Sequence, residues 1–321
     1  MQPDMITNNT YEATVIEEYS FTDLLQMKIN PFLLSLEVSD RTKKAYVTNI
    51  NYFVDWVKDS GMVIKTRDNI IAYRTWLISK KLKATTINAY LTAVRRFFGW
   101  LYEHDLIDKD FAKSVKSIQV DAEHKKDPIS EDQWIELMGG IDFAKLIDRR
   151  DYMIMVLGAN YGLRSIEIIR LNKEDIVMVQ GQWALMLWRK GYEEADKKPR
   201  PIMADHAEML LTLVGDGTAI FKSMSNNDCS IQSERLSTSG LRYAMRKRFR
   251  EASIESDRIS FHSLRHFFAT SLIKNDVPLL QVRDALDHKS VTTTEIYVAT
   301  ASRFDNPVAF GLNLATPTSI N

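Results

Sequence analysis

Residues 262–297 read HSLRHFFATSLIKNDVPLLQVRDALDHKSVTTTEIY, and this stretch decides how the rest of the chain is interpreted. It opens on His262 and Arg265 and closes on His288 and Tyr297. These four side chains offer cationic donors for a phosphate's charge, a proton shuttle and a hydroxyl nucleophile, which a metal-free enzyme needs to break a phosphodiester. Arginine suits such a site because its planar fork donates two hydrogen bonds to one phosphate. Taken singly, the same residues also fit a helix cap, surface charges and a core tyrosine.

The bulk composition is that of an ordinary soluble protein with about two domains. The 321 residues are 45% hydrophobic and 26% charged. No apolar run approaches the ~18 residues that a membrane span needs, and the start lacks the pattern of a signal peptide, so we expect a cytoplasmic protein. Cys229 is the only cysteine, which excludes disulfides within the chain and cysteine-based metal sites. The six histidines lack the spacing of a metal motif, and no metal or other cofactor is expected.

The formal net charge of zero is a sum of opposed regions. Residues 1–38 hold one base against six acids, whereas residues 39–101 hold twelve bases against four acids. Electrostatic steering by nucleic acid responds to the local field rather than to the total, so a neutral chain can still bind nucleic acid. A solvated helix face is the alternative interpretation of the basic excess. A further basic cluster consists of Arg242, Arg246, Lys247, Arg248 and Arg250.

Apolar residues recur at spacings of three and four between residues 21 and 119, which predicts a domain of four amphipathic helices. Residues 1–20 are expected to form a flexible arm. Ser39 or Asp40 can cap the second helix and Gly61 ends it, while Asp68 is predicted to open the third. The aromatic stripes are interpreted as core rather than as base-stacking surfaces. They include Trp56, Trp76, Phe97 and Trp100.

Residues 120–128 are polar and include a proline, which predicts a linker to a second domain over residues 129–303. A capping box at Ser130 begins this domain, and Ser165 is predicted to cap a short helix further on. The only convincing β pattern is a hairpin with the turn Gln180-Gly181, followed by an edge strand over residues 199–203. Helices fill the remainder. The fold class is therefore mainly α with a small antiparallel β-sheet.

A second constellation of chemistry-bearing residues precedes the opening stretch. Arg164 lies just before a helix N-terminus, where unpaired amides favour an anion, and Glu167 can brace its guanidinium one turn on. Lys190 follows the predicted hairpin on a loop, from which a flexible ammonium could protonate a leaving oxygen. The alternatives are an exposed ion pair at a helix end and a solvated lysine.

Taken in register, these motifs resemble the signature of the tyrosine recombinases, the phage-integrase type of site-specific recombinase. The resemblance rests on GLRSIE at 162–167, the Lys190-Gly191 loop, HSLRH at 262–266, LDH at 286–288 and Tyr297. The first domain adds SDRT at 39–42 with Tyr46, and ATTIN at 84–88 with Arg95, which are similar to the family's core-site DNA-binding domain. The resemblance spans about residues 39–300. Within the family, the chain resembles a simple two-domain member of the Xer-like or transposon type.

The resemblance implies a four-helix core-site DNA-binding domain, a mixed α/β catalytic domain, and a strand transferase without cofactor. Tyr297 would attack the scissile phosphate and form a 3′-phosphotyrosyl link. Arg164 and Arg265 would clamp the non-bridging oxygens, with His288 donating to the same phosphate. The remaining roles are an acid/base on the tyrosine side for His262, a general acid for Lys190 and a brace for Glu167.

Two departures from the family pattern concern the site. Asp287 stands where the family usually has glycine, and aspartate tolerates a left-handed turn better than most residues do. The loop after Lys190 is longer and more acidic than usual, which makes Lys197 or Lys198 a rival for the general acid.

The expected partner is double-stranded DNA with inverted-repeat core sites, bound by a dimer on one site and a tetramer on two, in association with the nucleoid. The reaction would serve integration and excision, resolution or inversion. Residues 304–321 are interpreted as a tail that protomers could exchange. The alternatives are a type IB topoisomerase-like enzyme and an inactive DNA-binding accessory protein. Expected DNA contacts are Arg41, Thr42, Lys43, Lys44, Thr85, Thr86, Arg95, Arg96, Arg242 and Arg246.

Overall fold

The chain divides into two compact units, Met1–Ala122 and Glu123–Asn321, which are described separately. The computed structural model describes residues 20–120, 127–188, 197–215, 217–225, 230–233, 235–288, 290–291, 294–295 and 297. Four sequence predictions therefore lie wholly or largely outside the described residues. They are the N-terminal arm, the centre of the linker, Lys190 and the tail over residues 304–321.

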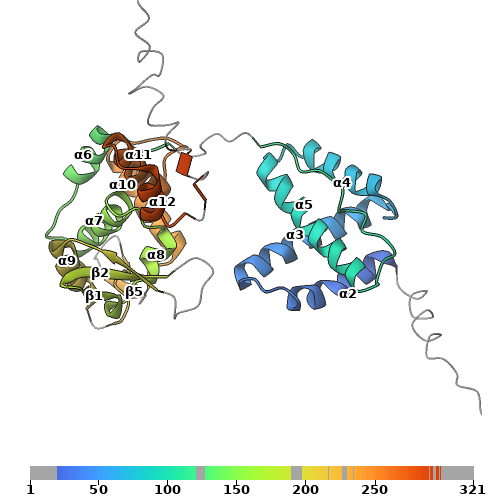
Figure 1. Ribbon diagram of the computed structural model, residues 1–321, viewed down its shortest axis with the longest axis horizontal. Helices are drawn as coiled ribbons and strands as arrows, with labels where there is room; N and C mark the ends of the chain where they lie inside the picture. Colours follow the sequence, from blue (N-terminus) through green and yellow to red (C-terminus); the bar gives the residue numbers. More distant parts are fainter. Residues whose placement is uncertain are drawn as a thin grey trace, which may run out of the picture. The chain divides into compact units, whose positions relative to one another are not determined.

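The first unit contains the four predicted helices, seen together in Figure 1. They are α2 (Phe21–Leu34), α3 (Asp40–Ser60), α4 (Arg67–Ser79) and α5 (Ala84–Glu103). Ser39 is the residue that caps α3, because its side chain accepts the backbone N–H of Thr42, and Gly61 ends the helix in the left-handed conformation. The prediction that Asp68 opens α4 was wrong by one residue, because the helix begins at Arg67, after the N-cap Thr66, which forms a capping box with Asn69.

The aromatic stripes of the first unit form its core, as predicted. Trp56 and Phe97 are buried, while Trp76 and Trp100 pack against the same core with partial exposure. Edge-to-face and stacked pairs fill the interior, such as Phe53 on Tyr73 with ring centroids 4.9 Å apart. The rings are therefore used for packing, and the polar residues at the starts of α3 and α5 remain outside the core.

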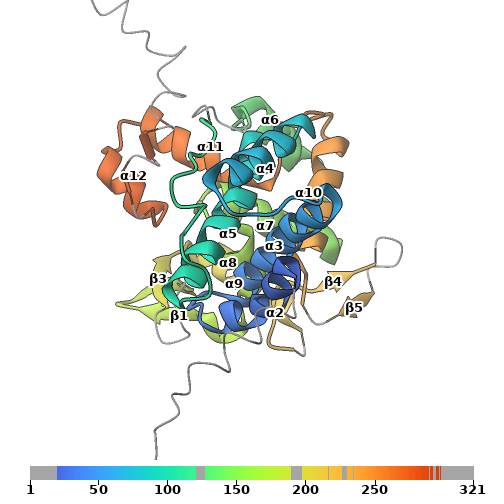
Figure 2. The same ribbon diagram turned by 90° about the vertical axis from the view of Figure 1, so that its right-hand side faces the viewer.

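The second unit is built around α7, which is buried from Met153 to Ala159 and packs against α11. Its helices are α6 (Glu131–Gly139), α7 (Leu146–Ala159), α8 (Ser165–Arg170), α9 (Ala204–Val214), α10 (Thr238–Glu251), α11 (Phe261–Lys274) and α12 (Leu279–Ala285), with the short 3-10 helix η1 (Lys173–Asp175). The chain passes directly from α11 into α12 (Figure 2), and residues 294, 295 and 297 are again helical. No helix in the described ranges is both long and apolar enough to cross a membrane.

A three-stranded antiparallel sheet in the order β1-β2-β3 covers one side of this unit. The strands are β1 (Ile176–Val179), β2 (Gln182–Leu187) and β3 (Lys198–Pro201). Gln180 and Gly181 both have positive φ, which is the geometry of a type I′ hairpin turn. A second hairpin, β4 (Ser223–Met224) with β5 (Ile231–Ser233), contradicts the prediction of a single β region. Strands of two and three residues are too short to show an alternating pattern.

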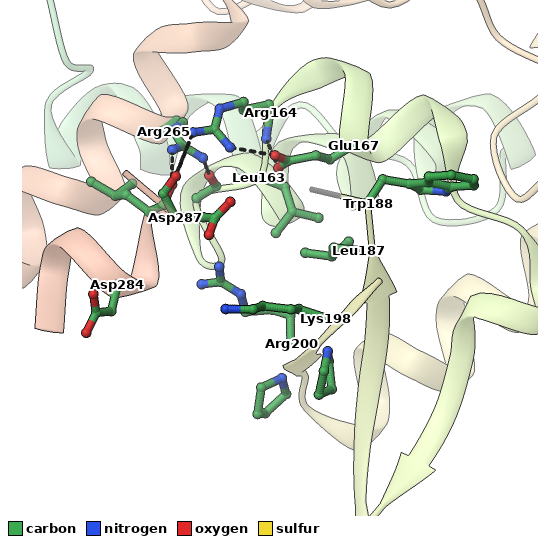
Figure 3. Close-up of a pocket in the computed structure, with 14 residues that line it drawn as sticks. Leu163, Arg164, Glu167, Leu187, Trp188, Lys198, Arg200, Arg265, Asp284 and Asp287 are labelled. Carbon is green, nitrogen blue, oxygen red and sulfur yellow. Dashed lines mark hydrogen bonds and ion pairs between the residues drawn. The ribbon is translucent and has the colours of Figure 1, made fainter. Parts of the chain in front are cut away.

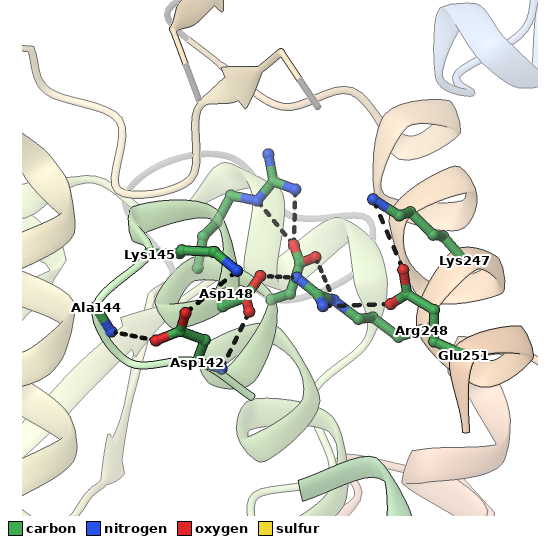
Figure 4. Close-up of polar contacts among 9 residues, drawn as sticks. Asp142, Ala144, Lys145, Asp148, Lys247, Arg248 and Glu251 are labelled. Atoms are coloured by element: carbon green, nitrogen blue, oxygen red, sulfur yellow. Dashed lines mark hydrogen bonds and ion pairs between the residues drawn. The ribbon is translucent and has the colours of Figure 1, made fainter. Parts of the chain in front are cut away.

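A buried ion-pair network joins α7 to α10 (Figure 4). Arg248 donates to Asp148 and, at 2.8 Å, to Asp151, which also accepts both Nε and Nη2 of Arg150. Burial alone would lower the pKa of the Arg248 guanidinium, but the two aspartates raise it above its usual value. Arg248, one of the basic cluster on α10, is therefore committed to the interior of the unit.

Replacing Arg248 with methionine should lower the free energy of unfolding by about 3 kcal/mol, because two buried carboxylates would lose their shared partner. Urea unfolding of the whole chain measures the change. Lys247→Met is the matched control, since Lys247 pairs only loosely with Glu251 at 3.8 Å on the exposed side, and it should change stability by less than about 0.5 kcal/mol. Equal losses in the two variants would contradict the assignment.

Candidate active site

A pocket of about 270 Å³ lies in the second unit between the start of α8, the strands β2 and β3, and the end of α12 (Figure 3). Its charged lining residues are Arg164, Glu167, Lys198, Arg200, Arg265, Asp284 and Asp287. Residues far apart in the sequence therefore converge on one cavity. Within the described ranges, no three His, Cys, Asp or Glu side chains gather closely enough to hold a metal ion.

Arg164 occupies the N-cap position of α8, which corrects the prediction that Ser165 is the cap. Glu167 explains the difference. Its carboxylate accepts the backbone N–H of Arg164 and the Nη1 of the same residue, both at 2.7 Å. Because one carboxylate holds both ends of Arg164, the guanidinium is fixed at the edge of the pocket. The bracing contact expected of Glu167 is present.

Arg265 lies on α11 and is only 2% exposed. It donates to the backbone carbonyls of Gly162 and Leu286. Burial, and then the neighbouring charge of Arg164, lower the pKa of Arg265 to about 10. The alternative that Arg265 is a surface charge is thereby excluded.

Gly162, whose carbonyl accepts from Arg265, packs closely against the Phe268 ring of α11. Its φ of +64° is left-handed, and a Cβ built there would lie 2.5 Å from Cδ1 of Phe268. Any other residue would be strained in this conformation and would also displace the Phe268 ring. The glycine of the Gly-Leu-Arg motif is thus required for the close packing of the chain against α11.

The turn after α12 contributes Leu286 and Asp287 to the pocket lining and leads directly into His288. Asp287 has a φ of +48°, the left-handed conformation anticipated for the position where the family usually has glycine. Arg164 donates through Nη2 to the carbonyls of Leu286 and Asp287, each at 3.3 Å. Arginines on two other elements therefore hold this turn from outside.

His288 and Tyr297 lie side by side. Their rings stack with centroids 6.2 Å apart, and His288 Nδ1 is 3.0 Å from the hydroxyl of Thr294. Burial, and then Arg265, Arg164 and His262, lower the pKa of His288 to about 4. The imidazole is consequently neutral at pH 7. With Thr294 on one ring nitrogen, the other nitrogen is available to a ligand.

Tyr297 is 4% exposed and packs with Ala269, Val282 and Leu286. Burial raises the pKa of its hydroxyl, against the opposing effect of Arg265 and Arg164. A buried phenol that is also influenced by two arginines is both a core residue and a candidate nucleophile. The two interpretations offered by the sequence are therefore compatible.

His262 is exposed at the first turn of α11, and His266 follows one turn later on the same face. The His266 ring lies 4.7 Å from His262 and 5.1 Å from Tyr297, edge-on to both. His266 thus links the two predicted site residues, a contact that sequence reasoning missed. The signal available was its spacing of four residues from His262, which puts both rings on one helix face.

The three lysines considered for the general acid are placed differently. Lys190 lies outside the described residues. Lys197 pairs with the buried Asp175 at 2.7 Å and lies 4.8 Å from the ring centroid of Trp188. Lys198, by contrast, lines the pocket. Of the two described lysines, Lys198 is the one positioned for chemistry.

Arg200 is a pocket residue that the sequence did not single out. It lies on β3 two residues after Lys198, so both side chains leave the same face of the strand and project into the pocket (Figure 3). Its Nη1 donates to the carbonyl of Ala285. The pocket therefore contains three arginines rather than the two expected.

The expected DNA contacts fall into two groups, one in the first unit and one on α10 of the second, and none of them is among the residues that line the pocket. In the first unit a shallow groove is lined by Thr42, Tyr46, Thr85 and other residues of α3 and α5. Arg96 donates to the Tyr46 hydroxyl at 3.2 Å beside this groove. Arg95 instead donates to Val115 and Ser117 and so holds the segment after α5. The other members are Arg41, Lys43, Lys44 and Thr86 at the starts of α3 and α5, and Arg242 and Arg246, exposed on α10.

The chain belongs to the phage integrase family. Residues 128–303 match that family, and residues 30–108 match the N-terminal SAM-like domain of phage integrases. The tyrosine recombinase XerD of Shewanella oneidensis is 24% identical over 292 residues, covering 88% of this chain and 94% of the relative. XerD of Vibrio vulnificus is 27% identical, covering 78% and 79%.

Solved structures with the same fold include recombinase–DNA complexes. The XerH site-specific recombinase bound to palindromic difH substrate has a TM-score of 0.66 at 16% identity, covering 89% of this chain and 83% of that one. A lambda integrase tetramer bound to a Holliday junction has a TM-score of 0.64 at 16% identity, covering 91% and 81%. These likenesses confirm the expected fold class: a helical N-terminal domain and a mainly α catalytic domain with a small antiparallel sheet.

The lowered pKa of His288 predicts a specific pH dependence of stability. Between pH 6.5 and about 4 the unfolded chain takes up the His288 proton while the folded chain does not, so stability falls as the pH falls through this window. His288→Gln removes that contribution. The variant should lose about 1 kcal/mol less than the wild type between pH 6.5 and 4, a discounted value because solvent screens the partly exposed ring. Urea unfolding at both pH values measures the difference, and equal losses would contradict the assignment.

Proposed function

We propose that this protein is a site-specific DNA recombinase that cleaves and rejoins DNA strands through a 3′-phosphotyrosyl intermediate. The observation that carries the proposal is the convergence of Arg164, Arg265, His288 and Tyr297 in one unit of a phage integrase family chain. The reaction needs positioning and charge stabilisation at a phosphoryl centre more than it needs covalent help from the protein. A cluster of fixed donors beside a tyrosine is suited to that task.

The arginines supply the charge stabilisation. In the free protein burial, and then the nearby charge of Arg164, lower the pKa of Arg265, so the two guanidiniums repel each other. A bound phosphodiester would relieve this repulsion, and its oxygens would accept hydrogen bonds from the remaining N–H groups of the two guanidiniums. Neutral His288 would add one hydrogen bond through the ring nitrogen that does not face Thr294. Removing one such donor typically costs ~10²–10³ in rate.

The proposed bond changes are those that the resemblance to the tyrosine recombinases implies. The Tyr297 hydroxyl oxygen attacks phosphorus, and His262, acting as the base, accepts the hydroxyl proton. The bond between phosphorus and O5′ breaks. A lysine protonates the departing 5′ oxygen. The 5′-hydroxyl of a second strand then attacks the phosphotyrosine in the reverse direction and releases Tyr297. Because the intermediate conserves the phosphodiester bond energy, no nucleotide cofactor is consumed.

Lys190 is the proposed general acid on the family pattern, and Lys198 is its rival. Support for Lys198 comes from its place in the pocket lining. Lys197 is withdrawn from this role because its ammonium is held by Asp175. Comparing Lys190→Ala with Lys198→Ala in a cleavage assay would assign the acid.

The proposed substrate is double-stranded DNA with inverted-repeat core sites, bound by residues 21–119 and 129–303 as two domains. A dimer would occupy one site and a tetramer two sites, with residues 304–321 exchanged between protomers. The tetramer is supported by the likeness to a lambda integrase tetramer bound to a Holliday junction. The comparisons do not favour the topoisomerase-like or the inactive accessory alternative, because the named relatives are tyrosine recombinases.

Tyr297→Phe should abolish covalent capture of DNA. The probe is a duplex containing a binding site selected from a random-sequence library and nicked beside the scissile phosphate, so that the released fragment diffuses away and the adduct accumulates. The wild type should form a protein–DNA adduct stable to denaturation, and Tyr297→Phe should form at least about 10³-fold less.

Tyr243→Phe is the matched control, since Tyr243 is 64% exposed on α10 of the same unit. It should retain the wild-type yield of adduct. Adduct formation by Tyr297→Phe at the wild-type rate would refute the assignment of the nucleophile.

Arg242→Ala should weaken DNA binding and reduce its salt dependence. Each lost phosphate contact lowers the slope of log K against log salt by about 0.9. Fluorescence anisotropy between 50 and about 200 mM salt measures the slope. Lys173→Ala, which alters an exposed lysine on η1, should leave the slope unchanged; an unaltered slope for Arg242→Ala would remove α10 from the DNA interface.

A further inference from the structure

Three guanidiniums hold three consecutive backbone carbonyls just before His288. Arg200 donates to the carbonyl of Ala285, Arg265 to that of Leu286, and Arg164 to those of Leu286 and Asp287. The last carbonyls of a helix have no partner within the helix and must find one elsewhere. At the end of α12 those partners come from β3, from α11 and from the residue that caps α8.

Arg200 occupies an unusual position for an edge strand. Burial lowers the pKa of the Arg200 guanidinium, with Glu167 and Asp287 acting in the opposite direction. Burying a cation is unfavourable unless its donors are satisfied. The Ala285 carbonyl satisfies one donor, and two carboxylates lie close enough to offset part of the charge.

The local sequence alone does little to stabilise the conformation of the segment that Arg200 holds. Helix α12 has only seven residues, and a helix of that length is not stable in isolation. The following Asp287 sits at a φ of +48°, which is strained for a residue other than glycine. The direction in which the turn presents His288 therefore depends on contacts from outside the turn.

We propose that Arg200 is a positioning residue: from β3 it fixes the Ala285 carbonyl, and through it the turn that presents His288 to the scissile phosphate. This inference rests on the proposed strand-transfer function. Arg164 and Arg265 hold the same turn and are also assigned to the phosphate; Arg200 lines the same pocket, but its contact with Ala285 acts on the turn that carries His288. The backbone of Arg200 pairs with Leu185 of β2, so the sheet serves as the rigid support for the Arg200 side chain.

A double-mutant cycle tests the proposal with the nicked duplex described above. Arg200→Met should lower the rate of adduct formation by about 10–100-fold, because a misplaced donor about 1 Å from its position loses this much, while DNA affinity stays unchanged. His288→Ala should lower the rate as well. In the His288→Ala background, Arg200→Met should cost less than about threefold more, since the two residues act as one unit.

The proposal would be overturned if the rate losses of the two single variants multiplied in the double variant. It would also be overturned if Arg200→Met changed the affinity for DNA but not the maximal rate of adduct formation. The matched control is Arg235→Met. Arg235 also holds a backbone carbonyl, that of Ile169 at 2.6 Å, but it does not line the pocket. It should leave the rate within about threefold of the wild type in either background.

Arg200→Lys gives a second route if the methionine variant does not fold. A lysine keeps the charge but replaces the fork with a single point donor, so the rate should fall less than in Arg200→Met and the cycle with His288→Ala should still be non-additive. Adduct formation by the wild type distinguishes failure of the role of Arg200 from failure of the strand-transfer function. If the wild type forms an adduct and the cycle is additive, only the role of Arg200 fails; if the wild type forms none, the strand-transfer function fails with it.

Discussion

The open carbonyl end of α12 is the point on which the site depends. A helix leaves its last acceptors unpaired, and in this protein guanidiniums from the cap of α8, from β3 and from α11 supply the donors. The same contacts bring together residues more than 100 positions apart in the chain, as Arg164 and Leu286 are. They also set the direction of the turn that carries His288. One requirement of backbone chemistry thus assembles a site from separate elements.

The buried arginines of the second unit have two different kinds of hydrogen-bond partner. Between α7 and α10, Arg248 and Arg150 meet carboxylates, which neutralise them within the fold. In the pocket, Arg265 and Arg200 donate to neutral carbonyls, and Glu167 holds Arg164 alone by a direct ion pair. A carbonyl satisfies a donor without cancelling its charge. The pocket arginines therefore stay charged for an anionic ligand, with Glu167 and Asp287 offsetting part of that charge, whereas the α7–α10 network stabilises the fold.

The sequence was sufficient for the features that repeat or that carry a motif. The spacing of apolar residues predicted the four helices of the first unit, and the capping box at Ser130 predicted the start of α6. The stretch from His262 to Tyr297 predicted side chains that the structure brings together, since His288 and Tyr297 stack and Arg265 lies within the influence of both.

Features that depend on contacts across the chain could not be predicted. Arg200 stands in the sequence KPRP, which resembles a solvated edge strand, and its partner Ala285 is 85 residues away. Ser165 is a better N-cap by residue type than Arg164, but the reach of Glu167 back to Arg164 decides the cap. The choice between Lys197 and Lys198 depended on Asp175, which binds the first and leaves the second in the pocket.

The central claim is that the pocket arginines are kept charged for a phosphate, and a neutral substrate tests it most directly. A methylphosphonate at the scissile position removes the negative charge while keeping the site otherwise similar. Arg265→Ala should be strongly impaired on the phosphate substrate, by ~10²-fold or more, and should be impaired much less on the methylphosphonate, where only its hold on the turn after α12 is lost. An equal loss on both substrates would contradict the claim, because it would mean that Arg265 holds the turn after α12 without answering the charge of the phosphate.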